Sequence, residues 1–269
     1  MSDSTHLLID PARLPALLGA AAARFNVISL AECESTNTLL MDYAAEGASA
    51  GTVIVTDRQT AGRGSRGRHW MASPEASLTF SVLWGFPGDL ERLSGLSLAV
   101  GVAVVQALER CGAQGVMLKW PNDILFGHAK LGGILVELHA DEECAMAVIG
   151  IGLNLRLPET IGAPSVSALP AAALEQIVDT LPERHVLFAR LLIELAQAFD
   201  RFAAGGFAAL RDEWHACHAW QDRPVRLLRE GRVEKEGVCA GADADGALLV
   251  RTSDGLERCL SGDVSLRPL

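Results

Sequence analysis

A glycine- and arginine-rich loop that leads into a strand is the feature that most constrains the fold of this chain. Gly62, Gly64 and Gly67 satisfy the spacing G-x-G-x-x-G, which is typical of dinucleotide-binding domains. In those domains a helix opens directly after the glycines, so that its N-terminus faces the pyrophosphate. Here Trp70 follows, and the residues from Ser77 to Trp84 are β-prone. The loop therefore excludes a Rossmann fold, and the absence of a following Gly-Lys-Ser/Thr excludes a P-loop.

The remaining elements predict an α+β fold, because strands and helices follow one another without strict alternation. Helices are expected over Pro11 to Arg24, Ser35 to Glu46, Leu93 to Arg110 and Val186 to Trp220, the last interrupted at Gly205-Gly206. Strands are expected over Thr52 to Thr56, Ser77 to Trp84, Val116 to Trp120, Leu131 to His139 and Met146 to Leu155.

The last stretch, Pro224 to Leu269, has a different character and predicts a small β-barrel. Its short β-prone runs are Val225 to Leu228, Ala247 to Thr252 and Glu257 to Leu260. Turn dipeptides separate them, namely Glu230-Gly231, Asp245-Gly246 and Asp254-Gly255.

Composition narrows the class of protein. A formal net charge of −10 over 269 residues argues against a protein that mainly grips nucleic-acid phosphates. The six cysteines include no Cys-x-x-Cys pair, a pattern typical of reduced thiols. The N-terminus has no early Lys or Arg, and its apolar run, Leu14 to Ala23, is too short to span a membrane. We therefore expect a cytoplasmic protein without membrane association.

The loop carries the residues of an anion site. Arg63, Arg66 and Arg68 supply fork-shaped donors to carboxylate or phosphate oxygens, and glycines let the backbone approach a ligand closely. Trp70 offers a flat face for a base. A solvated basic loop, or an RNA-binding segment of the Arg-Gly-Gly kind, is the alternative interpretation of the same residues.

Three further segments place polar residues at or near apolar strands. In Lys119-Trp120-Pro121-Asn122-Asp123, the Asn and Asp can read an adenine edge or hold a metal or an amine, although an isolated match is more often a plain turn. In Lys130 to Glu137, a lysine precedes paired glycines that leave room for a ligand, although a lone lysine there is usually surface. In Gly150 to Leu155, Asn154 is the sole polar side chain and needs a partner.

Taken together, these segments resemble the biotin–protein ligase family. The matching pieces are Glu34-Ser35-Thr36-Asn37, Gln59 with the glycine loop, Lys119 to Asp123, Lys130 to Glu137, Gly150 to Leu155, and the C-terminal Leu260 to Leu266. They occur in the family's order and spacing from about Ile28 onward, and several ordered motifs are far more specific than any one of them.

The resemblance implies a mixed β-sheet packed with helices, of the kind found in class II synthetases and biotin or lipoate ligases, followed by an SH3-like barrel. It divides the chain into an N-terminal helical segment (1–27), a catalytic domain (28–221) and the barrel (222–269). It implies two half-reactions: biotin and ATP form biotinyl-AMP, and the biotinyl group then passes to a lysine of a carrier domain such as that of acetyl-CoA carboxylase. Mg²⁺ is expected to accompany the pyrophosphate.

The family's functional residues carry over onto matching positions. Those implied to bind biotin are Ser35, Thr36, Asn37, Gln59, Arg63, Gly64, Ser65, Lys130 and Gly133. Those implied to bind ATP or the adenylate are Arg66, Arg68, Trp70, Asn122 and Asn154. The implied catalytic residues are Lys130, which bridges the biotin carboxylate and the α-phosphate, Arg63, and Asp123. Fixed cations bring two anions together, and a closing loop keeps water from the mixed anhydride.

Asp123 is our hypothesis for the group that orients the acceptor lysine or takes its proton. An Asp123→Asn variant is then expected to slow transfer more than adenylate formation, and equal losses in both half-reactions would count against the role.

This chain departs from the family at the position of Ser65, where a basic residue is usual. We expect biotinyl-AMP to leave this protein faster than a Ser65→Arg variant, as measured by retention of labelled adenylate on gel filtration; equal retention would remove the idea. The DNA-binding domain that some members carry is not evident in the sequence, so DNA binding is not expected. A monomer and a homodimer both remain open, and the metal ligands are unknown.

Three other interpretations compete with a biotin ligase. A lipoate–protein ligase shares the catalytic fold, but the arginine-rich loop and the C-terminal barrel favour biotin. A non-catalytic biotin or nucleotide sensor would keep the pocket, and RNA binding would show as salt-dependent retention. His215, Cys217 and His218 have partial metal-ligand spacing, but no fourth ligand is suggested, so no tightly bound transition metal is expected.

Overall fold

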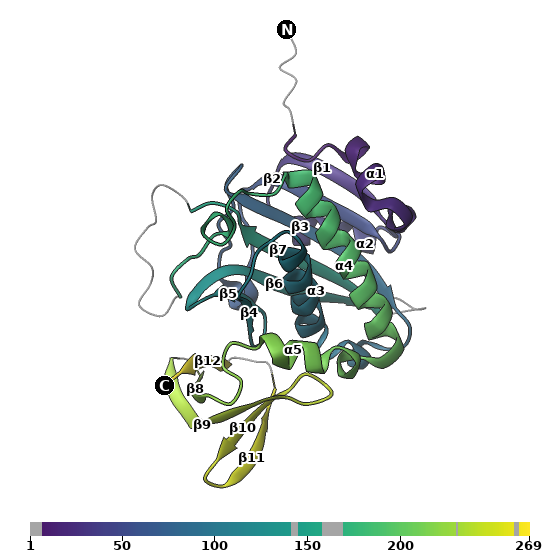
Figure 1. Ribbon diagram of the computed structural model, residues 1–269. Helices are drawn as coiled ribbons and strands as arrows, with labels where there is room; N and C mark the ends of the chain where they lie inside the picture. Colours follow the sequence, from purple (N-terminus) through teal and green to yellow (C-terminus); the bar gives the residue numbers. More distant parts are fainter. Residues whose placement is uncertain (1–6, 141–144, 158–168, 230, 261–263) are drawn as a thin grey trace.

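The computed structural model describes residues 7–140, 145–157, 169–229, 231–260 and 264–269, which form a large sheet with helices and a small sheet beside it (Figure 1). The large sheet has seven strands in the order β1-β2-β3-β7-β6-β5-β4. β1 and β2 are parallel, and the other neighbouring pairs are antiparallel. The sheet is therefore mixed, and the predicted α+β class is confirmed.

The strands of the large sheet are β1 (Asn26–Cys33), β2 (Thr52–Gln59), β3 (Ser77–Phe86), β4 (Val116–Lys119), β5 (Asp123–Phe126), β6 (Ala129–Ala140) and β7 (Ala145–Asn154). The α-helices are α1 (Leu14–Leu18), α2 (Thr36–Ala45), α3 (Leu96–Arg110), α4 (Arg184–Gly205) and α5 (Arg211–Cys217). Short 3₁₀ turns cover Pro11–Arg13, Gly19–Arg24, Ser65–Gly67, Leu90–Leu93, Leu174–Gln176 and Phe207–Ala209.

Alternate residues of the central strands bury against different helices, because successive side chains of a strand point to opposite faces. Val53 and Val55 of β2 belong to the main core, which also includes α3 and α4. Ile54 lies between them and packs in a second cluster with Leu40 of α2. The face of the sheet on which α2 lies also holds the polar residues of the site.

One segment, Leu90–Arg110, is long and apolar enough to cross a membrane by length and composition alone. In this structure its helical part is α3, which packs against α4 and carries eleven buried residues. Its apolar character is thus accounted for by the protein core.

The expected helix over Pro11 to Arg24 is wrong in its continuity. The chain there forms a 3₁₀ turn, the short helix α1 and a second 3₁₀ turn. Gly19 has φ +56°, in the left-handed region where an α-helix ends. The segment still packs through Leu14 and Leu18, which are buried in the main core.

The other predicted elements are confirmed within a few residues at each end. Ser35 caps α2 by accepting a hydrogen bond from the Thr38 backbone N–H, and α4 ends at Gly205 as expected. Strands β1, β5, β9 and β12 were not predicted. β5 has only four residues and directly follows the Pro-Asn pair, so its sequence resembles a turn.

The C-terminal part forms a small antiparallel domain, as predicted. Its strands are β8 (Pro224–Arg229), β9 (Arg232–Ala242), β10 (Leu248–Thr252), β11 (Gly255–Cys259) and β12 (Val264–Pro268), in the order β11-β10-β9-β8-β12. Residues 230 and 261–263 lie outside the described part, and with them part of the expected Glu230-Gly231 turn and of the Leu260 to Leu266 motif.

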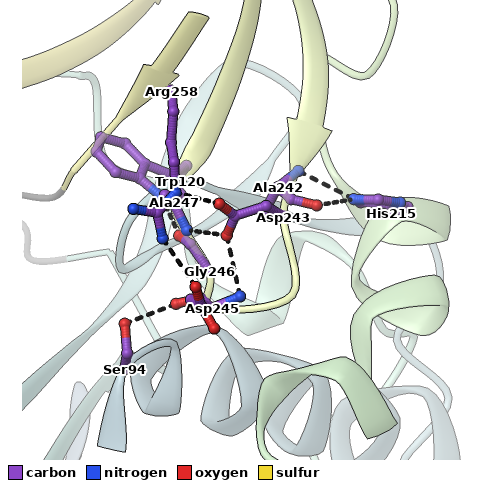
Figure 2. A network of polar contacts seen from close by, with 9 residues as sticks. All are labelled: Ser94, Trp120, His215, Ala242, Asp243, Asp245, Gly246, Ala247 and Arg258. Atoms are coloured by element: carbon purple, nitrogen blue, oxygen red, sulfur yellow. Dashed lines mark hydrogen bonds and ion pairs between the residues drawn. The ribbon is translucent and has the colours of Figure 1, made fainter. Parts of the chain in front are cut away.

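A turn of the small domain fixes it against the domain of the large sheet (Figure 2). Trp120 donates from Nε1 to the Gly246 carbonyl at 3.0 Å, and Ser94 donates from Oγ to the Asp245 carbonyl at 2.7 Å. The side chain of Asp243 braces the turn by accepting from the backbone N–H groups of Asp245 and Ala247. Because Trp120 follows β4 directly, the small domain is anchored next to the strand end that leads into the site.

Candidate active site

All but one of the residues predicted for the site line a single cavity of about 360 Å³. They come from the start of α2, the end of β2, the glycine loop and strands β5 to β7. The members are Ser35, Thr36, Asn37, Gln59, Arg63, Gly64, Ser65, Arg68, Trp70, Asn122, Asp123, Lys130, Gly133 and Asn154.

One end of the cavity is a buried polar array. Gln59 accepts at Oε1 from the Thr36 backbone N–H (2.8 Å) and from Thr36 Oγ1 (3.2 Å). Ser81 Oγ lies 2.6 Å from Asn37 Oδ1 and 2.7 Å from Thr36 Oγ1. Ser35, Thr36, Asn37 and Gln59 are each at most 9% exposed. Such a preordered set of donors and acceptors suits a small polar ring that enters an otherwise apolar pocket.

The other end holds a buried triad of two lysines around one carboxylate. Lys119 Nζ lies 2.5 Å from Asp123 Oδ2, and Lys130 Nζ lies 2.5 Å from Asp123 Oδ1. Burial alone would raise the pKa of Asp123, but Lys130 and Lys119 hold the pKa of this carboxyl well below its usual range. Burial lowers the pKa of Lys119, and Asp123 opposes that shift. With Asp123 ionised and both lysines protonated, the triad carries one net positive charge.

The strand register explains why these residues meet. Lys119 and Asp123 face each other across the tight β4–β5 connection, and Asp123 is the partner of Gly133 on β6. A Cβ on Gly133 would lie 3.2 Å from Lys130 Nζ, so the glycine leaves room for that side chain. The Lys130 backbone pairs with the 170–172 segment, because its N–H donates to the Pro170 carbonyl.

Asn122 and Asn154 serve as backbone ties in this structure. Asn122 Nδ2 donates to the Ile134 carbonyl at 2.8 Å. Asn154 Nδ2 donates to the carbonyls of Lys130 (3.2 Å) and Ala172 (3.0 Å), which satisfies the polar group that the sequence left open. Both residues line the cavity, so any contact with an adenine is limited to what these ties leave available.

The three arginines of the glycine loop point in different directions. Arg63 pairs with Glu137 through both guanidinium nitrogens, at 3.2 and 2.7 Å. Arg68 bonds to Ser65 within the loop and lines the cavity. Arg66 has φ +62°, donates to the Val264 carbonyl of the small domain and does not line the cavity. Its predicted contact with ATP is therefore not supported by this arrangement.

Trp70 closes one wall of the cavity against the glycines of β7. A Cβ on Gly152 would lie 2.4 Å from Trp70 Cε2, and a Cβ on Gly62 would lie 2.3 Å from the Trp70 carbonyl. Lys130 Nζ lies 5.7 Å from the centre of the indole ring. Only glycine at position 152 allows the indole to lie this close to the strand, beside the lysine.

Sequence reasoning missed two lining cations. Lys119 belongs to the motif from Lys119 to Asp123 but was given no role. A lysine at the end of an apolar strand is a signal for a buried charge. Arg267 comes from β12 of the small domain, and burial lowers its pKa, as do the nearby charges of Arg68 and Arg66. No local pattern relates residue 267 to a site whose other lining residues lie between positions 35 and 171.

The residues present do not form a dedicated metal site. No group of three or more His, Cys, Asp or Glu side chains converges within the described part of the chain. His215 Nε2 lies between the backbone N–H and carbonyl of Ala242, and His218 stacks on Trp214 with ring centroids 4.3 Å apart. Cys217 donates to the Glu213 carbonyl. His215 and Cys217 therefore have hydrogen-bond partners, whereas Nε2 of the buried His218 has none among the described residues.

Comparison with known families and proteins agrees with this geometry. Residues 30–154 match the Biotin/lipoate A/B protein ligase family, and residues 222–267 match the Biotin protein ligase C terminal domain. The Bifunctional ligase/repressor BirA of Salmonella typhimurium is 34% identical over 97% of this chain and 79% of its own length. A Biotin--[acetyl-CoA-carboxylase] ligase of Mycobacterium tuberculosis is 34% identical over 92% of this chain and 91% of its own.

A solved structure shows the same fold with ligands. The biotin protein ligase from Aquifex aeolicus in complex with biotin and ATP superposes with a TM-score of 0.77 and 31% identity, covering 91% of this chain and 99% of that one. The fold and the site thus define an enzyme of the biotin and lipoate ligase class. With the C-terminal domain matched as well, the chain belongs to the biotin protein ligase family.

Proposed function

We propose that the protein activates the carboxylate of biotin with ATP and transfers the biotinyl group from biotinyl-AMP to a lysine of a carrier domain. The observation that carries this proposal is the cavity itself, which has a buried polar array at one end and the Lys119–Asp123–Lys130 triad at the other. The first matches a polar ring, and the second matches the two anions that must react.

The first half-reaction joins two negative groups. The biotin carboxylate attacks the α-phosphorus of ATP, a carboxylate–phosphate bond forms, and pyrophosphate leaves. Lys130 is 26% exposed at its side chain and reaches the cavity, so it is placed to lie between the carboxylate and the α-phosphate. A fixed cation in a site with little water stabilises the charge of the transition state. Mg²⁺ enters this account as the counterion of the ATP substrate.

The second half-reaction needs a neutral amine that attacks the biotinyl carbonyl and expels AMP. Two ammonium groups on Asp123 make its carboxylate a weak base. We therefore retain the orienting part of the hypothesis for Asp123: its charge fixes Lys130 at the cavity, and the same carboxylate is proposed to orient the acceptor lysine.

Several further assignments rest on the family resemblance and complete the proposal. The acceptor is a carrier domain such as that of acetyl-CoA carboxylase, the catalytic domain spans residues 28–221, and the protein acts in the cytoplasm. Lack of DNA binding and the choice between monomer and homodimer stay predictions.

Biotin-dependent exchange of labelled pyrophosphate into ATP, measured without any acceptor, tests the adenylation step. Exchange that needs biotin and that lipoate does not support is the expected result. Bound biotin without exchange would instead indicate a sensor. Absence of both binding and exchange would overturn the proposal.

A further inference from the structure

Two arginines of the glycine loop, Arg63 and Arg68, line the cavity, and they differ in charge pairing. Arg63 is neutralised by Glu137, and Lys119 and Lys130 share the charge of Asp123. Arg68 has no carboxylate partner among the described residues. Within the same residues, its side chain donates hydrogen bonds to Ser65 alone.

Ser65 holds Arg68 at two points. Arg68 donates from Nε to the Ser65 carbonyl (3.2 Å) and from Nη2 to Ser65 Oγ (3.0 Å). Both residues line the cavity, and Arg68 lies near enough to Arg267 to lower its pKa further. A long arginine side chain otherwise loses considerable rotamer freedom on meeting a ligand, and a local clamp removes part of that cost in advance.

We propose that Ser65 is a positioning residue that holds the Arg68 guanidinium at the cavity, where Arg68 binds the phosphate groups of ATP and of the adenylate. The proposal rests on the adenylation function proposed above. It differs from a role of Ser65 as a biotin ligand, because the serine acts through Arg68 and not through contact with biotin.

The test compares KM for ATP and kcat of the pyrophosphate exchange among Ser65→Ala, Ser65→Thr, Arg68→Met and the double variant Ser65→Ala/Arg68→Met. Loss of one hydrogen bond to a charged group predicts a rise in KM for ATP of about tenfold in Ser65→Ala, with KM for biotin unchanged. Ser65→Thr keeps the hydroxyl and is expected to stay near the wild type. Arg68→Met is expected to show a larger rise.

Non-additivity is the decisive outcome. Once Arg68 is absent, the Ser65 hydroxyl has no guanidinium to position. The double variant is therefore expected to have the same KM for ATP as Arg68→Met alone. Ser253→Ala, in an exposed turn of the small domain, is the matched control and is expected to behave as the wild type. Independent multiplication of the two effects, or a Ser65→Ala variant that matches Ser253→Ala, would overturn the proposal.

The two proposals fail in different ways. Should the wild type catalyse no exchange, the adenylation function fails, and the dissociation constant for ATP in the same five variants then tests the role of Ser65 directly. Thermal unfolding of Ser65→Ala and Ser65→Thr separates lost positioning from lost folding. If Ser65 acts by positioning, the two variants have the same thermal stability and only Ser65→Thr keeps the wild-type KM for ATP.

Discussion

Asp123 is the charge on which two cations of the site depend, and this dependence has a measurable pH signature. The carboxylate is 5% exposed and contacts both lysine ammonium groups at 2.5 Å. Its pKa in the folded protein lies below the value of about 3.9 expected in the unfolded chain. The carboxylate therefore contributes stability above that unfolded value, and the contribution is lost as the pH falls through the folded pKa.

We predict that Asp123→Asn lowers the free energy of unfolding by about 3 kcal/mol near neutral pH, because it leaves buried lysines without a counter-charge. The difference between wild type and variant is expected to be constant above about pH 5 and to shrink as the pH falls toward 2. Denaturant unfolding at a series of pH values measures it. A difference that stays constant through this range would show that the ion pairs do not stabilise the fold.

Asp57 offers a control of opposite sign. Burial raises the pKa of Asp57, while the Leu8 backbone N–H and Arg184 oppose the shift. Because the pKa of Asp57 is higher in the folded protein than in the unfolded chain, the folded protein loses stability as the pH rises from the unfolded pKa to the folded pKa. The free energy of unfolding of the wild type minus that of Asp57→Asn is therefore expected to fall as the pH rises. The corresponding difference for Asp123→Asn is expected to rise with pH.

At the level of elements, strand β7 separates the two ends of the cavity with two glycines on one face. A Cβ on Gly150 would lie 2.1 Å from Asn37 Oδ1, in the polar array. A Cβ on Gly152 would lie 2.4 Å from the Trp70 ring, at the opposite end. Replacing glycine by alanine at these two positions of β7 is therefore expected to disturb different parts of the site.

We predict that Gly150→Ala raises KM for biotin and that Gly152→Ala raises KM for ATP, each about tenfold, since crowding of this kind costs 1–3 kcal/mol. Each variant is the control for the other, and both substrates are titrated in the exchange assay. An equal rise of both constants in both variants would mean that the strand does not divide the site in this way.

Most of the site, but not all of it, could be predicted from the sequence. All but one of the residues to which ordered motifs gave roles line the cavity, because each lies in a short segment with its own pattern. The ATP-binding role of Arg66 stays a prediction; in this structure Arg66 donates to the Val264 carbonyl, a contact that depends on another domain and that its local sequence does not indicate. Arg267 was missed for the same reason. Strand β5 was missed because four residues after a Pro-Asn pair carry too short a pattern.

For the whole molecule, the main question is how the small domain affects a site built mostly by the large one. The small domain contributes Arg267 to the cavity and the Val264 carbonyl that receives Arg66. Its position is set in part by the turn at Gly246, whose carbonyl accepts from Trp120 (Figure 2). A shift of this turn would therefore be felt at the cationic end of the cavity and not at the polar array.

Gly246→Ala is the substitution that tests this coupling. Gly246 has φ +80°, and a Cβ there would lie 2.6 Å from the Gly95 Cα at the start of α3, so the turn must move away from the helix. We predict a rise in KM for ATP of about fivefold with KM for biotin unchanged, in the same exchange assay. Gly231 has φ +79° with nothing within 4 Å of a Cβ, so Gly231→Ala carries a similar backbone cost without the clash. The control is expected to lose about 1 kcal/mol of stability while both KM values stay at the wild-type level. If both variants change KM for ATP equally, general loosening of the small domain is responsible; if neither does, the cationic end of the site does not depend on how this turn seats against α3.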